Sequence, residues 1–205
     1  MPTTDEILDG LRLISNDYTM ISIYWHIVIY SFIVLILSRL WKPSEKIAGL
    51  FLSLPFFTVA ILAWFNSNPF NGLLFTILTI LFLLFGLRLS QDRLKYSFPF
   101  YRIAGILLLL FGLWYPHFIE TDSVWTYFYA APTGLIPCPT LSTAIGIALI
   151  FNGFNSNPLK IVLLCFGFFY SLFGILKLGV YLDAVLLFGS VVMLIQFFHN
   201  RGYRN

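Results

Sequence analysis

Residues 20–40 read MISIYWHIVIYSFIVLILSRL, an apolar run with no Lys, Arg, Asp or Glu before Arg39. A helix needs about 20 such residues to cross the hydrocarbon core of a membrane. Only 10% of the 205 residues are charged and 59% are hydrophobic. Soluble domains carry about 25% charged residues. The composition therefore predicts an all-α fold, a polytopic bundle of transmembrane helices with the lipid bilayer as its surroundings.

Six further apolar runs follow, so the sequence predicts seven spans. They are residues 46–65, 70–90, 99–115, 134–151, 158–177 and 178–198. The fourth and fifth spans are short, and the last two must be joined by a tight turn. We expect residues 1–19 to form an N-terminal interfacial segment, residues 20–198 the transmembrane domain, and residues 199–205 a cytoplasmic tail.

The charges between the runs predict the orientation, because Lys and Arg are retained on the cytoplasmic side of a membrane. With the N-terminus outside, ten of the twelve basic residues lie inside and seven of the nine acids lie outside. The inner basic residues are Arg39, Lys42, Lys46, Arg88, Arg93, Lys95, Arg102, Lys160, Arg201 and Arg204. Seven spans with the N-terminus outside and the C-terminus in the cytoplasm follow from this asymmetry.

The segment before the first span has the pattern of an amphipathic helix. Ile7, Leu8, Leu11 and Ile14 recur at helical spacing, with acidic residues on the other faces. Such a helix suits the interface between membrane and water, although it can equally be a helical lead-in to the first span.

One short motif occurs twice, as FNSNP at residues 65–69 and again at residues 154–158. Three predicted spans separate the copies, so a repeat of three-span units would be inverted, as in many transporters. Asn-Ser-Asn-Pro is also ordinary chemistry for a turn followed by a helix start. Both interpretations stay open at this point.

The candidate functional residues gather around WYPHFIETDSVWTYFYAAPTGLIPCPT, residues 114–140. Ionisable residues at membrane depth are functional candidates by default. In the predicted topology the candidate binding residues all lie at or just below the outer face: His117, Cys138, His26, Glu120, Asp122 and Asp183. His117, Cys138 and His26 are the candidate ligands of a divalent metal ion, which is the candidate cofactor.

Each of these residues also has a purely structural interpretation. Glu120 and Asp122 can be solvated loop acids, and His26 can be hydrogen-bonded within the bundle. Two prolines flank Cys138 at the start of the fifth span, where a helix N-terminus would favour a thiolate or a bound anion. The alternative is a rigid helix start with an inert cysteine. The aromatic residues of the 116–133 loop fit an interfacial belt or a re-entrant segment.

Over residues 112–146, and again at FGFFYSLFGILKLGVYLD, the chain resembles a family of bacterial polytopic membrane proteins defined by a domain of unknown function. Some members carry the label permease, which implies transport across the bacterial inner membrane. GLIPCPT is also similar to the Pro-Cys-Pro helix start of nickel/cobalt exporters. This chain lacks the His-rich loop and the His-acid helix signatures of those exporters.

The leading functional hypothesis is a transporter or permease for a small solute or ion, coupled to a proton or carrying a divalent metal. The first alternative is a membrane enzyme or redox protein that uses Cys138. The second is a non-catalytic accessory subunit. The sequence contains no GxSxG, HExxH, CxxC or phosphate loop, which argues against common enzymes, and no basic patch for nucleic acid. The substrate, the coupling ion and the oligomeric state do not follow from the sequence.

Overall fold

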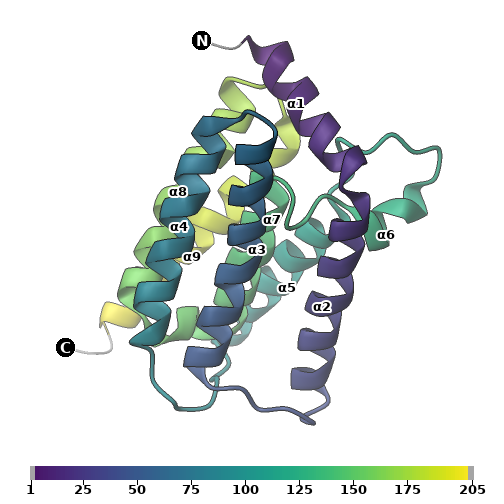
Figure 1. Cartoon of the computed structure of the whole chain (residues 1–205). Coiled ribbons are helices and arrows are strands. Elements are labelled where there is room, and N and C mark those ends of the chain that lie inside the picture. Colours follow the sequence, from purple (N-terminus) through teal and green to yellow (C-terminus); the bar gives the residue numbers. More distant parts are fainter. Residues whose placement is uncertain (1–2, 203–205) are drawn as a thin grey trace.

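The computed structural model describes residues 3–202, and in that range the chain is entirely helical apart from turns and loops (Figure 1). Nine α-helices follow one another in this part of the chain: α1 Thr4–Asp17, α2 Thr19–Leu37, α3 Glu45–Phe65, α4 Pro69–Leu87, α5 Pro99–Trp114, α6 Tyr127–Ala130, α7 Pro137–Ile150, α8 Asn157–Leu176 and α9 Ala184–Gly202. Three short 3-10 helices accompany them: Val124–Thr126, Asn152–Asn155 and Tyr181–Asp183. The predicted helical bundle is confirmed.

Five helices are long and apolar enough to cross a membrane, which supports a multi-pass membrane protein. They correspond to the first, second, third, sixth and seventh predicted spans, and are α2, α3, α4, α8 and the segment Tyr181–His199. The other two predicted spans are the shorter helices α5 and α7. By length and composition the structure therefore supports five spans, and the count of seven depends on how α5 and α7 cross.

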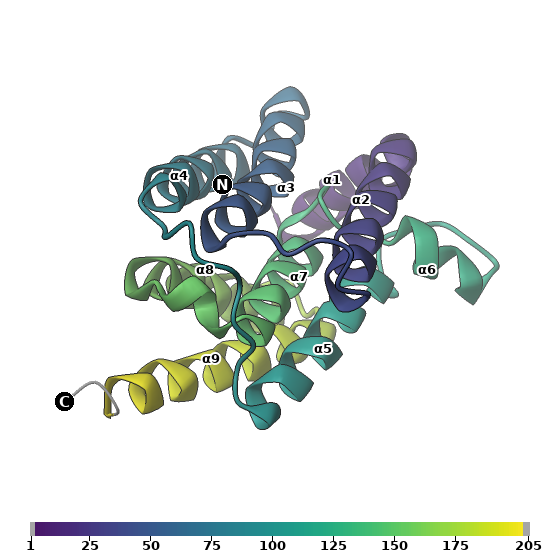
Figure 2. The same cartoon turned by 90° about the horizontal axis from the view of Figure 1, so that it is seen from below.

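Helix α7 lies at the centre of the bundle, with α2, α3, α5, α8 and α9 around it (Figure 2). Every residue of α7 is buried except Cys138, which is partly exposed. A helix that is apolar on all sides is stable only in the interior of a protein or a membrane. Here α7 forms the core on which the longer helices pack, so its two ends lie inside protein.

Glycine residues bring α5 and α7 into backbone contact. A Cβ atom on Gly105 would lie 2.6 Å from the carbonyl oxygen of Gly146, and one on Gly146 would lie 2.6 Å from the backbone nitrogen of Leu109. Small residues allow such close approach between membrane helices, where van der Waals packing drives association. The contact fixes α5 against α7 and thereby places the residues at their ends.

The predicted amphipathic segment forms α1, which lies across one end of the bundle and leads almost directly into α2 (Figure 1). A capping box starts α1, because the Thr3 hydroxyl accepts from the Glu6 backbone and the Glu6 carboxylate accepts from the Thr3 backbone. Leu11 and Ile14 are buried, so the apolar face packs on the bundle. We call this the α1 end and the other the opposite end.

The two FNSNP copies form turns at different ends of the bundle and differ in backbone conformation. In the first copy Asn68 caps α4 by accepting from the Asn71 backbone, and Ser67 has a positive φ of 55°. In the second copy Ser156 caps α8. The capping residue is thus shifted by one position, which favours ordinary turn chemistry for these motifs over a structural repeat.

A left-handed turn separates α7 from α8 at the opposite end. Its residues Asn152, Gly153, Phe154 and Asn155 all have φ between 50° and 58°. Only glycine adopts this region without steric cost. The buried side chain of Lys160 packs against Gly153, where no Cβ would fit. This turn ends the central helix abruptly and aims Asn155 at the start of α3.

The predicted cytoplasmic tail, residues 199–205, begins as the last part of α9, which continues to Gly202. Residues 203–205 of that predicted segment lie outside the described residues. Residues 199–202 of the predicted tail are therefore helical.

Candidate functional site

The site at the α1 end is built around Asp183, whose side chain is 1% exposed. Its Oδ1 atom accepts a hydrogen bond of 2.8 Å from the Tyr115 hydroxyl. Its Oδ2 atom accepts from the Cys138 thiol, with a sulfur to oxygen distance of 3.1 Å. Among the described residues no cation forms an ion pair with this carboxylate. Asp183 is thus a buried acid held by two neutral donors.

The local sequence explains how these three side chains meet. Tyr115 directly follows α5, Cys138 lies in the first turn of α7, and Asp183 ends the 3-10 turn that leads into α9. Pro137 and Pro139 fix the backbone on both sides of Cys138, and proline suits the first turn of a helix. The packing of α5 on α7 then places Tyr115 beside that turn.

Gly174 on α8 provides the space for the carboxylate. A Cβ atom at this position would lie 1.8 Å from Asp183 Oδ2 and 2.8 Å from its Cγ atom. Any larger residue would therefore displace the acid from its two donors. The sequence indicates small residues on this span, but it does not link Gly174 to Asp183.

Helix α1 covers the site from one side. Leu11 and Ile14 of α1 belong to the same buried apolar cluster as Tyr115, with Leu135 and Val180. This cluster separates the carboxylate from the surface at the α1 end. Opening the site in that direction therefore requires α1 to move.

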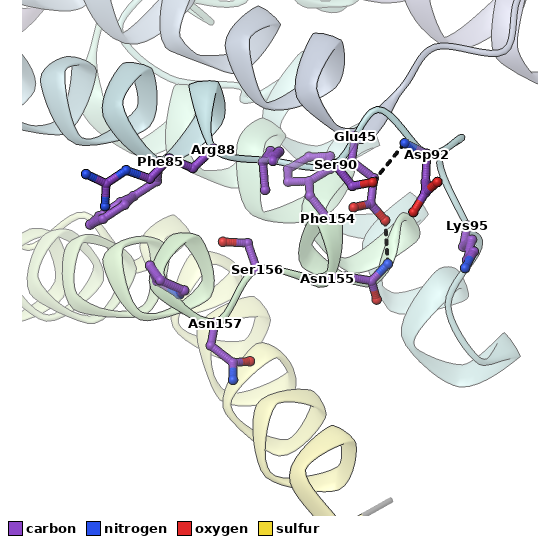
Figure 3. A pocket seen from close by; sticks show the side chains of 12 residues that line it. Glu45, Phe85, Arg88, Ser90, Asp92, Lys95, Phe154, Asn155, Ser156 and Asn157 are labelled. Atoms are coloured by element: carbon purple, nitrogen blue, oxygen red, sulfur yellow. Dashed lines mark hydrogen bonds between the residues drawn. The ribbon is translucent and has the colours of Figure 1, made fainter. Parts of the chain in front are cut away.

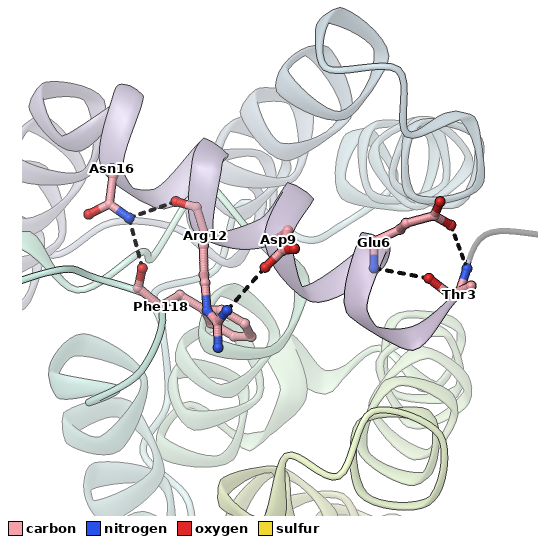
Figure 4. A network of polar contacts seen from close by, with 6 residues as sticks. All are labelled: Thr3, Glu6, Asp9, Arg12, Asn16 and Phe118. Carbon is pink, nitrogen blue, oxygen red and sulfur yellow. Dashed lines mark hydrogen bonds and ion pairs between the residues drawn. The ribbon is translucent and has the colours of Figure 1, made fainter.

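Few polar contacts fix α1 to the loops beneath it (Figure 4). The Asn16 amide donates to the carbonyl of Phe118 at 3.0 Å, and its oxygen accepts from the Glu120 backbone at 2.9 Å. The ion pair between Arg12 and Asp9 lies within α1 and is largely exposed. Exposed pairs contribute little to stability, so apolar packing and the Asn16 contacts hold this cover.

The structure brings two of the six predicted residues, Cys138 and Asp183, into direct contact. His117 does not contact Asp183 through a hydrogen bond. Its ring packs edge-on against that of Tyr115, at a centroid distance of 6.5 Å. Burial, and secondarily the positive charge of Arg12, lowers the pKa of His117 below its ordinary value. His117 therefore borders the site as a predominantly neutral imidazole.

Glu120 and Asp122 lie on the exposed part of the 116–133 loop, and neither carboxylate forms a hydrogen bond or ion pair with another described residue. Their interpretation as solvated loop acids is therefore supported. The loop itself extends beside α2 and carries the short helix α6 (Figure 1). Trp125 is 74% exposed on it, which fits an aromatic belt at a membrane interface.

His26 is buried at a different place, between α2 and α5. Its Nδ1 atom lies 2.9 Å from the carbonyl oxygen of Ser22, and its Nε2 atom lies 2.9 Å from that of Leu113. A neutral imidazole donates from only one nitrogen, so both contacts are hydrogen bonds only when the ring is doubly protonated. These contacts give His26 a role in joining α2 to α5.

The predicted metal site of His117, Cys138 and His26 is not assembled. The range from residue 3 to residue 202 contains no group of three or more His, Cys, Asp or Glu side chains that could hold a metal ion. Both ring nitrogens of His26 face backbone carbonyl oxygens, and the Cys138 thiol donates its hydrogen bond to Asp183. The structure offers an acid with two donors instead.

Tyr115 is the site residue that the sequence did not single out as a binding residue. It is fully buried, although it stands in an aromatic cluster that the sequence assigns to an interfacial belt. Tyrosine hydroxyls in buried positions usually find a partner, so a Tyr at the outer end of a span, followed by proline, was the available signal.

Comparison of the chain with protein-family models, curated proteins and solved structures finds no match. The function must therefore be inferred from the geometry of the site.

Proposed function

We propose that this chain is a multi-pass transporter that moves a small solute or ion in exchange for, or together with, a proton carried by Asp183. The observation that supports it is the burial of the Asp183 carboxylate without a cationic partner. Acids inside membrane helices are costly, face the bundle interior and mark ion or proton pathways. The bacterial inner membrane is the location that this proposal adopts, on the resemblance described above.

The proposal keeps seven crossings, with the N-terminus outside and the C-terminus in the cytoplasm. Helix α7, with 14 residues, spans only about 21 Å, against about 30 Å for the hydrocarbon core. Irregular backbone at membrane depth is tolerated where it is buried in protein. Thr133, Leu135 and Ile136 before α7 and Phe151 and Phe154 after it are buried, which supports a short helix extended at both ends.

Such interrupted helices, with their ends near the substrate and coupling-ion sites, are a recurring feature of transporters. In this chain the N-terminal turn of α7 carries Cys138, and Asp183 directly precedes the first residue of α9. Two helix starts thus meet at one carboxylate. The positive ends of both helices stabilise its charged form when the proton has left.

Proton uptake at this acid needs only local changes. In the charged state both oxygens accept, from Tyr115 and Cys138. A proton on Oδ2 reverses one contact, because the carboxyl O–H then donates to the sulfur atom. Exchange of that proton with the outside requires displacement of α1 and its apolar contacts. The cover formed by α1 is therefore the proposed outer gate.

The alternative in which Cys138 acts as a redox or catalytic thiolate is less well supported. The thiol donates to a carboxylate, which holds the proton on the sulfur atom, so the expected thiolate is not what this contact favours. Both cysteines are free, and Cys165 is exposed on α8. We therefore assign Cys138 the role of a donor that positions Asp183. Residues 3–202 supply no ligand set that would support a metal ion.

Purified protein in proteoliposomes loaded with a pH-sensitive dye tests this proposal. A panel of small solutes and ions is applied with and without a pH gradient. We expect a solute that evokes proton movement in the wild type, and no such movement with Asp183→Asn. Glu120→Gln is the matched control, because this acid is exposed and its carboxylate forms no hydrogen bond or ion pair within residues 3–202. Proton-coupled flux that persists in Asp183→Asn would refute the proposal.

A further inference from the structure

A cavity of about 700 Å³, drawn in Figure 3, opens at the opposite end of the bundle from α1 (Figure 1). Small-molecule sites typically have volumes of about 300–1,000 Å³. Three segments form its walls: the start of α3, the end of α4 with the loop after it, and the turn that leads into α8. The cavity is lined by two acids, two cations, polar side chains and two phenylalanines, so it combines apolar surface with charges of both signs.

Glu45 is the buried charge of this cavity, with an exposed fraction of 4%. One of its carboxylate oxygens accepts a hydrogen bond from the Asn155 amide in the left-handed turn. Among the described residues the other oxygen has no hydrogen-bond partner, and Lys95 does not come within ion-pair distance. Buried carboxylates with an open oxygen are favourable sites for a cation or a strong donor.

The other side of the cavity offers groups that attract an anion. Helix α8, 20 residues long, starts there with the Ser156 cap, and the backbone N–H of Asn157 has no acceptor in the described part of the chain. Figure 3 shows Arg88 on one side and Glu45 with Asp92 on the other, with Ser156 and Asn157 between them in this view. A helix N-terminus together with a guanidinium group suits a phosphate.

Opposite charges this close to one cavity would be expected to pair, but they do not. Arg88 and Lys95 form no ion pair with Glu45 or Asp92 within the described residues. The four charges sum to zero, with Arg88 on one side of the cavity and Lys95 near the two acids on the other, so the acidic side keeps a net negative charge (Figure 3). A ligand that matches them carries one negative and one positive group at its two ends.

We propose that this cavity binds a zwitterion that joins a phosphate to a primary ammonium group, the chemistry of a phosphoethanolamine headgroup. The phosphate lies against Arg88 and the start of α8, and the ammonium group donates to the open oxygen of Glu45. Two sources share this chemistry, a membrane phospholipid and a free phosphoethanolamine ester. The proposal is independent of the transport proposal, because it concerns binding at the other end of the bundle.

The test measures binding to the full-length chain in detergent by native mass spectrometry, with thermal stabilisation as a second readout. The probes are short-chain phosphatidylethanolamine, short-chain phosphatidylglycerol, which lacks the ammonium group, and soluble glycerophosphoethanolamine. We expect phosphatidylethanolamine to bind at least tenfold more tightly than phosphatidylglycerol, because a charge-assisted hydrogen bond to Glu45 is lost in the second lipid. Binding of glycerophosphoethanolamine identifies a free ester as sufficient, and its failure assigns the site to the lipid.

Two variants probe the two ends of the ligand. Glu45→Gln keeps an oxygen for Asn155, and should reduce the preference for ethanolamine over glycerol at least tenfold. Arg88→Gln should weaken both lipids by about tenfold. Arg93→Gln, in the same loop but outside the cavity lining, is the control and should change neither affinity by more than twofold. If Glu45→Gln does not fold, the proposal is tested by the affinity of Arg88→Gln for the two lipids. Equal binding of both lipids to the wild type, or unchanged binding to Arg88→Gln, would overturn the proposal.

Discussion

A buried carboxylate lies near each end of the central helix α7, and the two are held in different ways. Asp183, at the start of α7, has hydrogen-bond donors on both oxygens and lies beneath the cover of α1. Glu45, beyond the end of α7, has one donor and borders a cavity. The comparison separates two roles for a membrane acid. The closed site can keep or release a proton, whereas the open site has room for a ligand.

The largest expected effect comes from filling the space beside the closed carboxylate. Gly174→Ala places a methyl group where Asp183 Oδ2 now lies, so the acid must leave both donors. We expect a loss of about 3 kcal/mol of stability, the upper range for overpacking, measured as a lower unfolding temperature of the purified protein.

Gly10→Ala is the matched control, because nothing lies within 4 Å of a Cβ at that position of α1. It should be neutral or stabilise the chain by up to about 1 kcal/mol, since alanine is the better helix former. Equal effects of the two substitutions would show that the carboxylate is not where the structure places it.

A smaller effect is expected from removing one donor of the closed site. Tyr115→Phe leaves Asp183 Oδ1 without its partner, which should cost about 2 kcal/mol because the acceptor is a carboxylate. Tyr170→Phe removes a hydrogen bond of 3.0 Å to the neutral amide of Asn71 in the same bundle. That control should cost about 1 kcal/mol. Chemical or thermal unfolding measures both, and a reversed order would argue that Asp183 is neutral in the resting protein.

The two FNSNP turns allow the ends of the bundle to be compared at matched positions. Ser67 has a positive φ, and its side chain makes no hydrogen bond to the part of the chain that the structure describes, so Ser67→Gly should stabilise the chain by about 0.5 kcal/mol. Ser156 caps α8, so Ser156→Ala should destabilise it by about 1 kcal/mol. The unfolding temperature should therefore rise in Ser67→Gly and fall in Ser156→Ala. If both variants shifted the unfolding temperature in the same direction, the two motifs would be better interpreted as equivalent parts of a repeat.

The smallest effect concerns pH at the α1 end. Burial lowers the pKa of His117 in the folded chain below its ordinary value of 6.5. The unfolded chain therefore binds the proton first as the pH falls below about 6.5, and stability decreases there; above that pH this contribution is constant. His117→Gln should lose less stability than the wild type between pH 6.5 and pH 5. Parallel unfolding temperatures of the two proteins over this range would contradict the shift.

Much of the fold could be predicted from the sequence because hydrophobic runs determine where membrane helices lie. The bounds of α2, α3, α4 and α8 follow the apolar runs closely, whereas α9 begins only at Ala184, after the start of its run at residue 178. The sequence could not show that α7 stops after 14 residues, because the left-handed turn at Asn152–Asn155 is set by packing on Lys160 and Glu45. The hydropathy of a segment contains no information about such tertiary contacts.

The site was predicted only in part, for a related reason. Membrane depth indicates which polar residues are costly, and it singled out Cys138 and Asp183, which lie in direct contact in the structure. It could not separate His26 from them, since the contacts of His26 to the carbonyls of Ser22 and Leu113 depend on the angle between α2 and α5. Tyr115 was hidden among interfacial aromatic residues, and only the burial of its hydroxyl against Asp183 reveals its role.

The most direct test of the central claim is infrared difference spectroscopy of the purified protein during a pH titration, with Asp183→Asn for assignment. A proton-binding acid in this site must give a carbonyl band of a protonated carboxyl group that vanishes at alkaline pH. We predict that this band is present in the wild type and in Glu120→Gln, and absent in Asp183→Asn. A spectrum without any pH-sensitive carboxyl band that depends on Asp183 would contradict the account.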